Sequence, residues 1–331
     1  MITRRLFAAL AVTAALATAA CGSGDANDKG VRADGSVDLT QVTLRIGDQK
    51  ANALQALLDV SGEAKDLPYK LEWAQFTAGP PLLEAINAGS IDLGGVGNAP
   101  PVFAAAAKSQ IKIVSAYTTG FQGQGIVVPA ASAIRDPKEL RGKKIAVTKG
   151  SSAHYHLLQV LAKNGLSFGD IEPQYLQPAD ALAALSTGRV DAWAVWDPYV
   201  AQAEQQGNRV LVNGEGYVRG DSFYVAGTKA LENKASSAAI RDLLLRIARA
   251  QAWIKANPEA WAQESSKITG VPYEVTLVAV KRAVYQHHSL DAATIAGEQE
   301  VADAFAAADL VPRKVDITEF VDTRFNDRFT A

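Results

Sequence analysis

Two serines and two histidines stand beside a glycine in the stretch "KGSSAHYH", residues 149–156. These residue types raise three possibilities: a Ser/His catalytic site, a phosphate-binding loop, or a helix start without chemistry. On a period of 3.6 residues, His154 shares one stripe with three leucines of the predicted helix and should face the packed side. His156 points roughly the opposite way and is expected to lie in solvent.

Helical geometry and missing sequence motifs argue against the first two possibilities, the catalytic site and the phosphate-binding loop. A serine nucleophile needs its base within hydrogen-bond reach and ordinarily sits in a "G-x-S-x-G" elbow, but the second glycine is absent here. A phosphate loop would need "G-K-[ST]" after Gly150, which the sequence also lacks. What remains is an anion-binding site, called the seat below, built from Ser151, Ser152 and nearby N–H groups, with His154 as a further donor. The alternative is that the serines only cap the helix and His154 is a core residue.

Three more strand-to-helix junctions resemble this one. "FTAGPP" offers Gly79, "GVGNAPP" offers Asn98 as N-cap, and "VWDPY" offers Asp197 as N-cap with Pro198 at the first helical position. Free N–H groups and the helix dipole favour an anion at such sites. If two lobes face each other, these junctions line one cleft.

Trp196 ends a predicted strand next to Asp197. Its indole could form an apolar wall for the alkyl part of a ligand, or it could simply pack in the core, as Trp193 should. A carboxylate in an anion site repels the anion, so we expect Asp197 to direct its charge at its own helix or to meet an amine of the ligand.

Short β-rich runs alternate with helical ones from residue 43 and predict βαβ units with mainly parallel sheets. Helices are expected near 80–88, 100–108, 152–164, 179–186 and 198–206, and only helices after residue 229, near 235–256, 258–267, 273–285 and 296–308. The expected strands are "VTLRIG", "YKLEWAQ", "IDLGGVG", "IKIVSAY", "GIVVP", "KKIAVTK", "PQYLQ", "VDAWAVW", "RVLVN" and "SFYVAG".

An internal echo, that is, a residue pattern that occurs twice in the sequence, indicates how these strands and helices are grouped into lobes. The stretch 82–101 and the stretch 181–200 share a helix, a glycine, an "[IV]-D" strand entry and a polar residue before proline. Two lobes with similar βαβ connectivity would produce this offset of 99 residues. The alternative is chance, because a glycine between a helix and a strand is common in α/β proteins. The aligned pairs are Gly89 with Gly188, Asp92 with Asp191, Val96 with Val195, and Asn98 with Asp197.

The first twenty residues carry two arginines and then an apolar run that is too short to span a bilayer, as in a secretory signal peptide. Cys21 is the only cysteine and resembles the acylated cysteine of a bacterial lipobox; the alternative is an ordinary secreted protein. Residues 21–41 then provide the lipid attachment site and a flexible tether.

Charge and size restrict the function further. Without residues 1–20, 31 basic side chains stand against 35 acidic ones and no basic run exists, which disfavours nucleic acid as a partner. The four histidines, His287 and His288 among them, show no metal-ligand spacing, and we expect neither metal nor cofactor. A folded body of about 290 residues should divide into two lobes.

At this point the residues resemble a known family. "RIGDQK", "FTAGPPLLEAINAGSIDLGGVGNAPPVFA", "KGSSAHYHLL", "VDAWAVWDPY", "DSFYVAG" and "LVPRKVDI" look like the periplasmic aliphatic-sulfonate-binding proteins of ABC importers. The resemblance implies a type II periplasmic binding protein fold, α/β, with two lobes joined by two crossover strands. Lobe 1 would comprise 42–125 plus 225–331, and lobe 2 would comprise 126–224.

The resemblance also implies a ligand cleft and its partners. Many relatives have aspartate where this chain has Asn98, and Thr119, Gln122 and Gln124 of the crossover are further candidates. The implied function is a monomeric receptor that delivers an aliphatic sulfonate to a permease with its ATPase, without catalysis. Alternatives are taurine, nitrate or a thiamine precursor as ligand, a sensor, or a Ser/His hydrolase on the same scaffold. The implied ligand-binding residues are Gln49, Gly79, Asn98, Ser151, Ser152, His154, Trp196 and Asp197.

Overall fold

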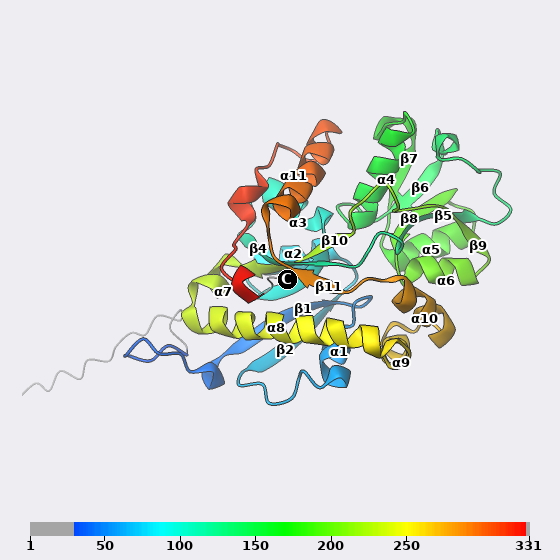
Figure 1. Ribbon diagram of the computed structural model, residues 1–331. Coiled ribbons are helices and arrows are strands. Elements are labelled where there is room, and N and C mark those ends of the chain that lie inside the picture. Colours follow the sequence, from blue (N-terminus) through cyan, green and yellow to red (C-terminus); the bar gives the residue numbers. More distant parts are fainter. Residues whose placement is uncertain (1–29, 329–331) are drawn as a thin grey trace, which may run out of the picture.

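The computed structural model describes residues 30–328. Within them the chain forms two α/β lobes, each built on its own mixed sheet (Figure 1). The predicted signal peptide and residues 21–29 of the expected tether, Cys21 among them, lie outside the described residues. Residues 30–41 lie inside them and include a bridge between Val31 and Val37 and a short 3-10 helix, Leu39–Gln41. In residues 30–328 no helix is both long and apolar enough to cross a membrane.

The first sheet has six strands in the order β11-β4-β10-β3-β1-β2. Strand β1 runs parallel to β2 and β3, while β10 runs antiparallel to both β3 and β4. The inner strands β4, β10, β3 and β1 are largely buried because helices cover both faces of the sheet, whereas the edge strands β2 and β11 are more exposed. The strands are β1 (Thr43–Gln49), β2 (Lys70–Phe76), β3 (Leu93–Gly97), β4 (Ile111–Thr118), β10 (Asp221–Gly227) and β11 (Gln286–His288).

The second sheet repeats this plan with five strands in the order β7-β6-β8-β5-β9. Strand β6 runs parallel to β7 and β8, and β5 runs antiparallel to β8 and β9. Each sheet therefore contains a parallel βαβ unit and one strand that follows a crossing between the lobes. That strand, β10 in the first sheet and β5 in the second, runs antiparallel to both of its neighbours. The strands are β5 (Gln124–Pro129), β6 (Lys144–Val147), β7 (Glu172–Tyr175), β8 (Ala192–Trp196) and β9 (Asn208–Asn213).

Helices follow most strands and cover the sheets. The long helix α8 runs beneath the first sheet and leads to α9 and α10, which lie beside the second lobe (Figure 1). The helices are α1 (Leu54–Ser61), α2 (Gly79–Asn87), α3 (Ala99–Ala106), α4 (Ser152–Lys163), α5 (Pro178–Ser186), α6 (Tyr199–Gln205), α7 (Thr228–Glu232), α8 (Lys234–Ala256), α9 (Pro258–Thr269), α10 (Tyr273–Arg282) and α11 (Ala292–Ala307).

The two crossings between the lobes lie side by side. The Thr119 N–H donates to the Gly220 carbonyl at 3.1 Å, and a Cβ on Gly220 would meet the Gly120 carbonyl carbon at 2.5 Å. With β5 starting at Gln124 and β10 at Asp221, the crossings occupy 119–123 and 214–220. The expected boundaries at 125/126 and 224/225 fall inside strands, and we propose the crossings as the lobe boundaries instead.

All ten expected strands are present, but the tail is not purely helical. Residues Gln286–His288 form β11, which pairs antiparallel with β4. The segment carries no apolar alternation that would predict a strand. His287 is therefore not remote from the sheet: its ring stacks on Tyr224 with 5.6 Å between centroids. Helix α1 was also missing from the expected elements.

The internal echo corresponds to a repeated set of hydrogen bonds. The Asp92 carboxylate accepts from the Arg45 N–H at 2.8 Å, and the Asp191 carboxylate accepts from the Lys144 N–H at the same distance. Arg45 and Lys144 are themselves 99 residues apart. Each aspartate ties the entry of one parallel strand to its neighbour, so the repeat is structural and not chance punctuation.

The lobes touch on both sides of the space between them. Tyr155 and Leu158 of α4 share a core cluster with Phe305 of α11. On the other side, Ala201 of α6 packs with Val275 and other apolar residues of α10. The lobes are thus closed on each other.

Candidate ligand-binding site

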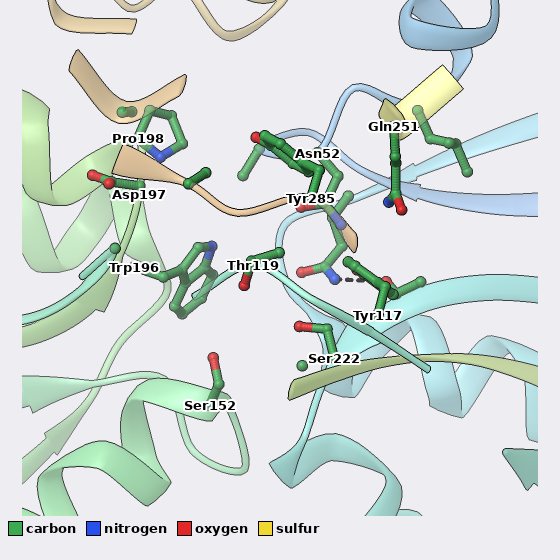
Figure 2. A pocket seen from close by; sticks show the side chains of 18 of the residues that line it. Asn52, Tyr117, Thr119, Ser152, Trp196, Asp197, Pro198, Ser222, Gln251 and Tyr285 are labelled. Carbon is green, nitrogen blue, oxygen red and sulfur yellow. Dashed lines mark hydrogen bonds between the residues drawn. The ribbon is translucent and has the colours of Figure 1, made fainter. Parts of the chain in front are cut away.

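A cavity of about 150 Å³ lies between the two lobes. Strand ends, helix starts and the crossing at 119–123 contribute to its wall, as Figure 2 shows for side chains of both lobes. This is where ligands bind in open α/β sheets, because the carboxyl ends of the strands meet the helix starts there. The cavity is lined by six of the eight predicted site residues: Gln49, Gly79, Ser151, Ser152, Trp196 and Asp197.

The start of α4 brings two serines to the cavity. Ser151 is the N-cap, and its Oγ accepts from the His154 N–H at 3.3 Å. Ser152 follows as the first helical residue, and its Oγ accepts from Gln124 Nε2 at 3.0 Å. Accepting that bond leaves the Ser152 hydroxyl hydrogen to donate. The Ser151 hydroxyl keeps its hydrogen for the same reason, but Ser151 is buried and Ser152 is only partly buried, so Ser152 is the more accessible donor.

The structure does not bring His154 to the cavity. Two residues along a helix rotate the side chain by about 200°, so His154 points away when Ser152 points in. Its Nδ1 accepts from the Gly150 N–H at 3.1 Å, and its ring packs edge-on against Phe168 with 4.9 Å between centroids. Nδ1 is thus engaged by backbone, and Nε2 is buried without a hydrogen-bond partner among the described residues, so neither nitrogen pairs with a serine hydroxyl. Burial lowers the pKa of His154 to about 3.

The prediction that His156 lies in solvent is wrong. The side chain is fully buried, and its Nε2 lies 3.0 Å from the Asn213 carbonyl oxygen. Helix α4 has no free face in its first turns, because the second sheet covers one side and the other lobe covers the opposite side. Burial lowers the pKa of His156 to about 4, so the ring is neutral and donates to that carbonyl.

Three predicted residues of the first lobe have separate roles. Gln49 lines the cavity and donates its Nε2 to the Gly95 carbonyl at 2.8 Å. Gly79 lets the starts of α2 and α3 approach, since a Cβ there would meet Pro100 Cγ at 2.7 Å. Asn98 lines a smaller neighbouring pocket that shares Ser152 with the main cavity. Its buried Oδ1 has no hydrogen-bond partner among the described residues.

Trp196 and Asp197 close the cavity from the second lobe. The Trp196 ring is partly buried and meets the Tyr199 ring edge-on. Helix α6 starts one residue later than expected, with Pro198 as its N-cap, yet the Asp197 carboxylate still accepts from the Ala201 N–H at 3.1 Å. Asp197 also forms an ion pair across the lobes with Arg282 of α10, at 3.3 Å.

The cavity contains two carboxylates and, among residues 30–328, no lysine or arginine in its lining. Asp48 is buried at the end of β1, and its oxygens accept from the Leu54 and Gln55 N–H groups at 2.9 and 3.3 Å. Burial raises the pKa of Asp48 and of Asp197 to about 6. Both carboxylates point at helix starts, which limits their repulsion of an anion. A bound anion would thus be held by neutral donors and helix dipoles.

Sequence reasoning missed most of the aromatic and amide wall. Those from α8, α9 and the chain after α10 lie where no motif marks them. Asp48, Ser222 and Tyr224 lie inside "RIGDQK" and "DSFYVAG" but were not singled out. Of the three candidates at the crossover, Thr119 and Gln124 line the cavity and Gln122 does not. The missed lining residues include Asp48, Asn52, Tyr117, Ser222, Tyr224, Gln251, Trp261 and Tyr285.

Two lobes of matching topology, closed over a cavity at their helix starts, define a periplasmic-type solute-binding protein. Comparison with known proteins agrees. Residues 77–261 match the family model described as "NMT1/THI5 like". A protein of Escherichia coli (strain K12) named as an aliphatic sulfonates-binding protein is 39% identical over 287 residues, which are 83% of this chain and 87% of that protein.

Solved structures give the same result. The alkanesulfonate-binding protein SsuA from Xanthomonas axonopodis pv. citri, bound to MOPS, is 37% identical with a TM-score of 0.80, over 85% of this chain and 98% of that one. The periplasmic aliphatic sulphonate binding protein SsuA from Escherichia coli is 38% identical with a TM-score of 0.76, over 85% and 92% of the chains. The chain belongs to the aliphatic sulfonate-binding proteins of the NMT1/THI5-like family.

Proposed function

We propose that this protein captures aliphatic sulfonates outside the cytoplasm and delivers them to the permease of an ABC importer. The observation that carries the proposal is the closed cavity at the start of α4, where Ser152 offers a hydroxyl and the lining offers no cationic side chain. A sulfonate has one charge spread over three oxygens, so several neutral donors suit it. The relatives that share more than a third of their residues with this chain are binding proteins by name, not enzymes.

Within the cavity, the sulfonate oxygens would accept from Ser152 and from N–H groups at the start of α4. Thr119 lies nearby on the crossing (Figure 2). The indole of Trp196 would cover the first carbons of the organic group. Contacts from both lobes favour the closed arrangement, because an open form would lose half of them.

Isothermal titration of the purified protein with ethanesulfonate, taurine, sulfate and nitrate tests the ligand. We expect ethanesulfonate to bind with a dissociation constant in the micromolar range, about −8 kcal/mol, and sulfate and nitrate to bind more weakly. Tight binding of an inorganic oxyanion without binding of ethanesulfonate or taurine would overturn the sulfonate assignment and leave the fold unaffected.

Delivery to a permease and attachment through Cys21 belong to the same proposal. A lipid on Cys21 would hold the receptor at the outer face of the membrane while the tether lets it reach the permease. Metabolic labelling with a radioactive fatty acid should mark the natural chain and not the Cys21→Ser variant. Loss of sulfonate uptake on deletion of the gene, with complementation restoring it, separates transport from sensing.

A further inference from the structure

A second, smaller pocket adjoins the ligand cavity at the start of α4. Its volume is about 10 Å³, which is enough for one water molecule. The residues that line both pockets form the wall between them: Thr119, Gln124, Ser152 and Ser222. Figure 2 shows Thr119, Ser152 and Ser222 grouped on this side of the cavity. Asn98 lines the smaller pocket and not the cavity, so this side chain lies behind the seat.

Two side chains of the smaller pocket carry a buried oxygen without a partner. The Asn98 side chain is 6% exposed, and its Oδ1 has no hydrogen-bond partner within residues 30–328. The Oε1 of Gln124 is buried and equally unpaired in that part of the chain. Native structures rarely leave buried amide oxygens unpaired. A water molecule has two O–H donors and fits a pair of acceptors, and the hydroxyls of Thr119 and Ser222 can donate to it in return.

The two unpaired oxygens come from opposite lobes. Asn98 precedes α3 in the first lobe, and Gln124 begins β5 in the second. The lobes approach closely at this point, since a Cβ on Gly97 would meet Ser152 Cβ at 2.9 Å. A molecule that bonds to both oxygens is therefore held there only while the lobes are closed.

We propose that a bound water molecule bridges Asn98 Oδ1 and Gln124 Oε1 and thereby orients the Ser152 hydroxyl toward the ligand. Gln124 Nε2 donates to Ser152 Oγ at 3.0 Å. The water holds the amide in this orientation, because the reversed amide would turn its oxygen to Ser152 and take the hydroxyl hydrogen for itself. That hydrogen stays available for a sulfonate oxygen instead. Asn98 and Gln124 are thus positioning residues, and the inference rests on the proposed function.

A metal cation suits this pocket less well than water. The Asp221 carboxylate in its lining already pairs with Arg219 at 3.1 Å and lies 3.6 Å from His288 Nε2. Amide and hydroxyl oxygens alone would leave the charge of a buried cation uncompensated. Throughout the described residues, no group of three or more His, Cys, Asp or Glu side chains is arranged to hold a metal ion.

The first test is a double-mutant cycle on the affinity for ethanesulfonate. Asn98→Leu and Gln124→Leu should each weaken binding about tenfold, because each leaves a buried polar group unpaired. Since both residues act through one water, the loss in the double variant should be smaller than the product of the single losses by a factor of about three or more. Losses that multiply would contradict the bridge. Gln205→Leu, on the exposed surface of α6, is the control and should leave the loss caused by Asn98→Leu unchanged.

Asn98→Asp separates the bridge from a packing role of this side chain. Aspartate has almost the same shape and keeps an acceptor oxygen for the water, although its charge weakens anion binding overall. Gln124→Leu should therefore weaken binding by the same factor in Asn98→Asp as in the natural protein, and by a smaller factor in Asn98→Leu. Equal factors in all three backgrounds would refute the coupling. Thermal unfolding shows whether each variant is folded.

A crystal structure of the natural protein with ethanesulfonate decides the matter even if a variant does not fold. We expect one water within hydrogen-bond distance of both Asn98 Oδ1 and Gln124 Oε1, and Ser152 Oγ within the same reach of a sulfonate oxygen. A pocket without water, or an Asn98 side chain bonded directly to the sulfonate, overturns the bridge and upholds the proposed function. If the natural protein binds no sulfonate in titration, the proposed function itself fails.

Discussion

At the scale of single residues, the proposed anion site has no cationic side chain in its lining among residues 30–328. The donors around the cavity are hydroxyls, amides and helix-start N–H groups, and its two carboxylates are turned toward helix starts. Such a site binds by hydrogen-bond geometry more than by net charge, which suits capture followed by release. Individual hydroxyls should therefore matter measurably.

Ser152→Ala should weaken sulfonate binding by about 10- to 100-fold, because a hydrogen bond to a charged group contributes about 1.5–3 kcal/mol. Titration calorimetry measures the change, and the melting temperature should stay the same since Ser152 is only partly buried. Ser186→Ala, a serine on the surface of α5, is the matched control. Equal affinities of the natural protein and the Ser152→Ala variant would show that Ser152 does not bind the sulfonate.

Sulfonate affinity should rise as the pH falls from 7.5 to 5.5. Burial holds the pKa of Asp48 and of Asp197 at about 6. A bound anion disfavours the ionised form of each carboxyl and raises both pKa values further, so binding takes up protons. The gain is at most tenfold per pH unit for each proton taken up.

Calorimetry in two buffers of different ionisation enthalpy measures that proton uptake directly. Asp48→Asn should take up fewer protons than the natural protein at pH 6.5. Affinity that falls on acidification would contradict this account of the two carboxylates.

The residue scale also shows where the sequence was informative. Helix-start motifs identified Ser151, Ser152 and Asp197, because capping chemistry leaves a local signature. His154 and His156 could be phased on the helix but not assigned, since which lobe covers each face of α4 depends on tertiary packing. Gln251 and Trp261 lie in an ordinary amphipathic pattern that gives no sign of a cavity.

At the scale of elements, the site depends on how closely helix starts from opposite lobes approach. Gly97 ends β3 in one lobe, and Ser152 begins α4 in the other. A Cβ on Gly97 would meet Ser152 Cβ at 2.9 Å, which real Cβ atoms essentially never do. The absence of a side chain at Gly97 therefore permits full closure.

Gly97→Ala should weaken ligand binding about tenfold or more while leaving the unfolding temperature within a few degrees, because the clash lies between lobes and not within one. Gly169→Ala is a suitable control, since its nearest neighbour would be Ser167 Oγ at 3.6 Å and its φ is not positive. Small-angle scattering with saturating ligand should show a larger radius of gyration for Gly97→Ala than for the natural chain. Identical affinity and size would refute the close-approach argument.

Elements were the most predictable level of the structure. Alternating strands and helices have strong periodicity, and the 99-residue echo predicted two lobes of similar wiring, in which Asp92 and Asp191 make equivalent bonds to the neighbouring strand. Strand β11 was not predicted, because its three residues show no alternation and are recognisable as a strand only through their pairing with β4. Sheet pairing of this kind is a long-range property that local sequence does not encode.

At the scale of the whole molecule, the ligand cavity exists because two lobes close. An apolar contact between α6 and α10 holds one side, together with Arg282, which pairs with Asp197 at 3.3 Å and with Glu204 at 2.8 Å. Arg282 is largely covered, with 18% of its side chain exposed. It therefore links the lobes more effectively than a surface pair would.

Arg282→Ala should speed ligand dissociation and weaken affinity by about 10-fold or more, since it opens the closed form and leaves Asp197 buried without its partner. Stopped-flow tryptophan fluorescence would measure the dissociation rate. Lys281→Ala is the matched control on the same helix, because its pair with Glu259 is exposed and should contribute little. Equal dissociation rates for Arg282→Ala and Lys281→Ala would exclude the bridge from the closing mechanism.

The most direct test of the sulfonate site is a crystal structure of the protein with 2-bromoethanesulfonate. Anomalous scattering locates bromine and sulfur separately and therefore fixes the orientation of the ligand. We predict the sulfonate oxygens within hydrogen-bond distance of Ser152 at the start of α4, with bromine directed toward the apolar part of the cavity. A ligand bound outside the space between the lobes, or a sulfonate group placed against Trp261, would contradict the account.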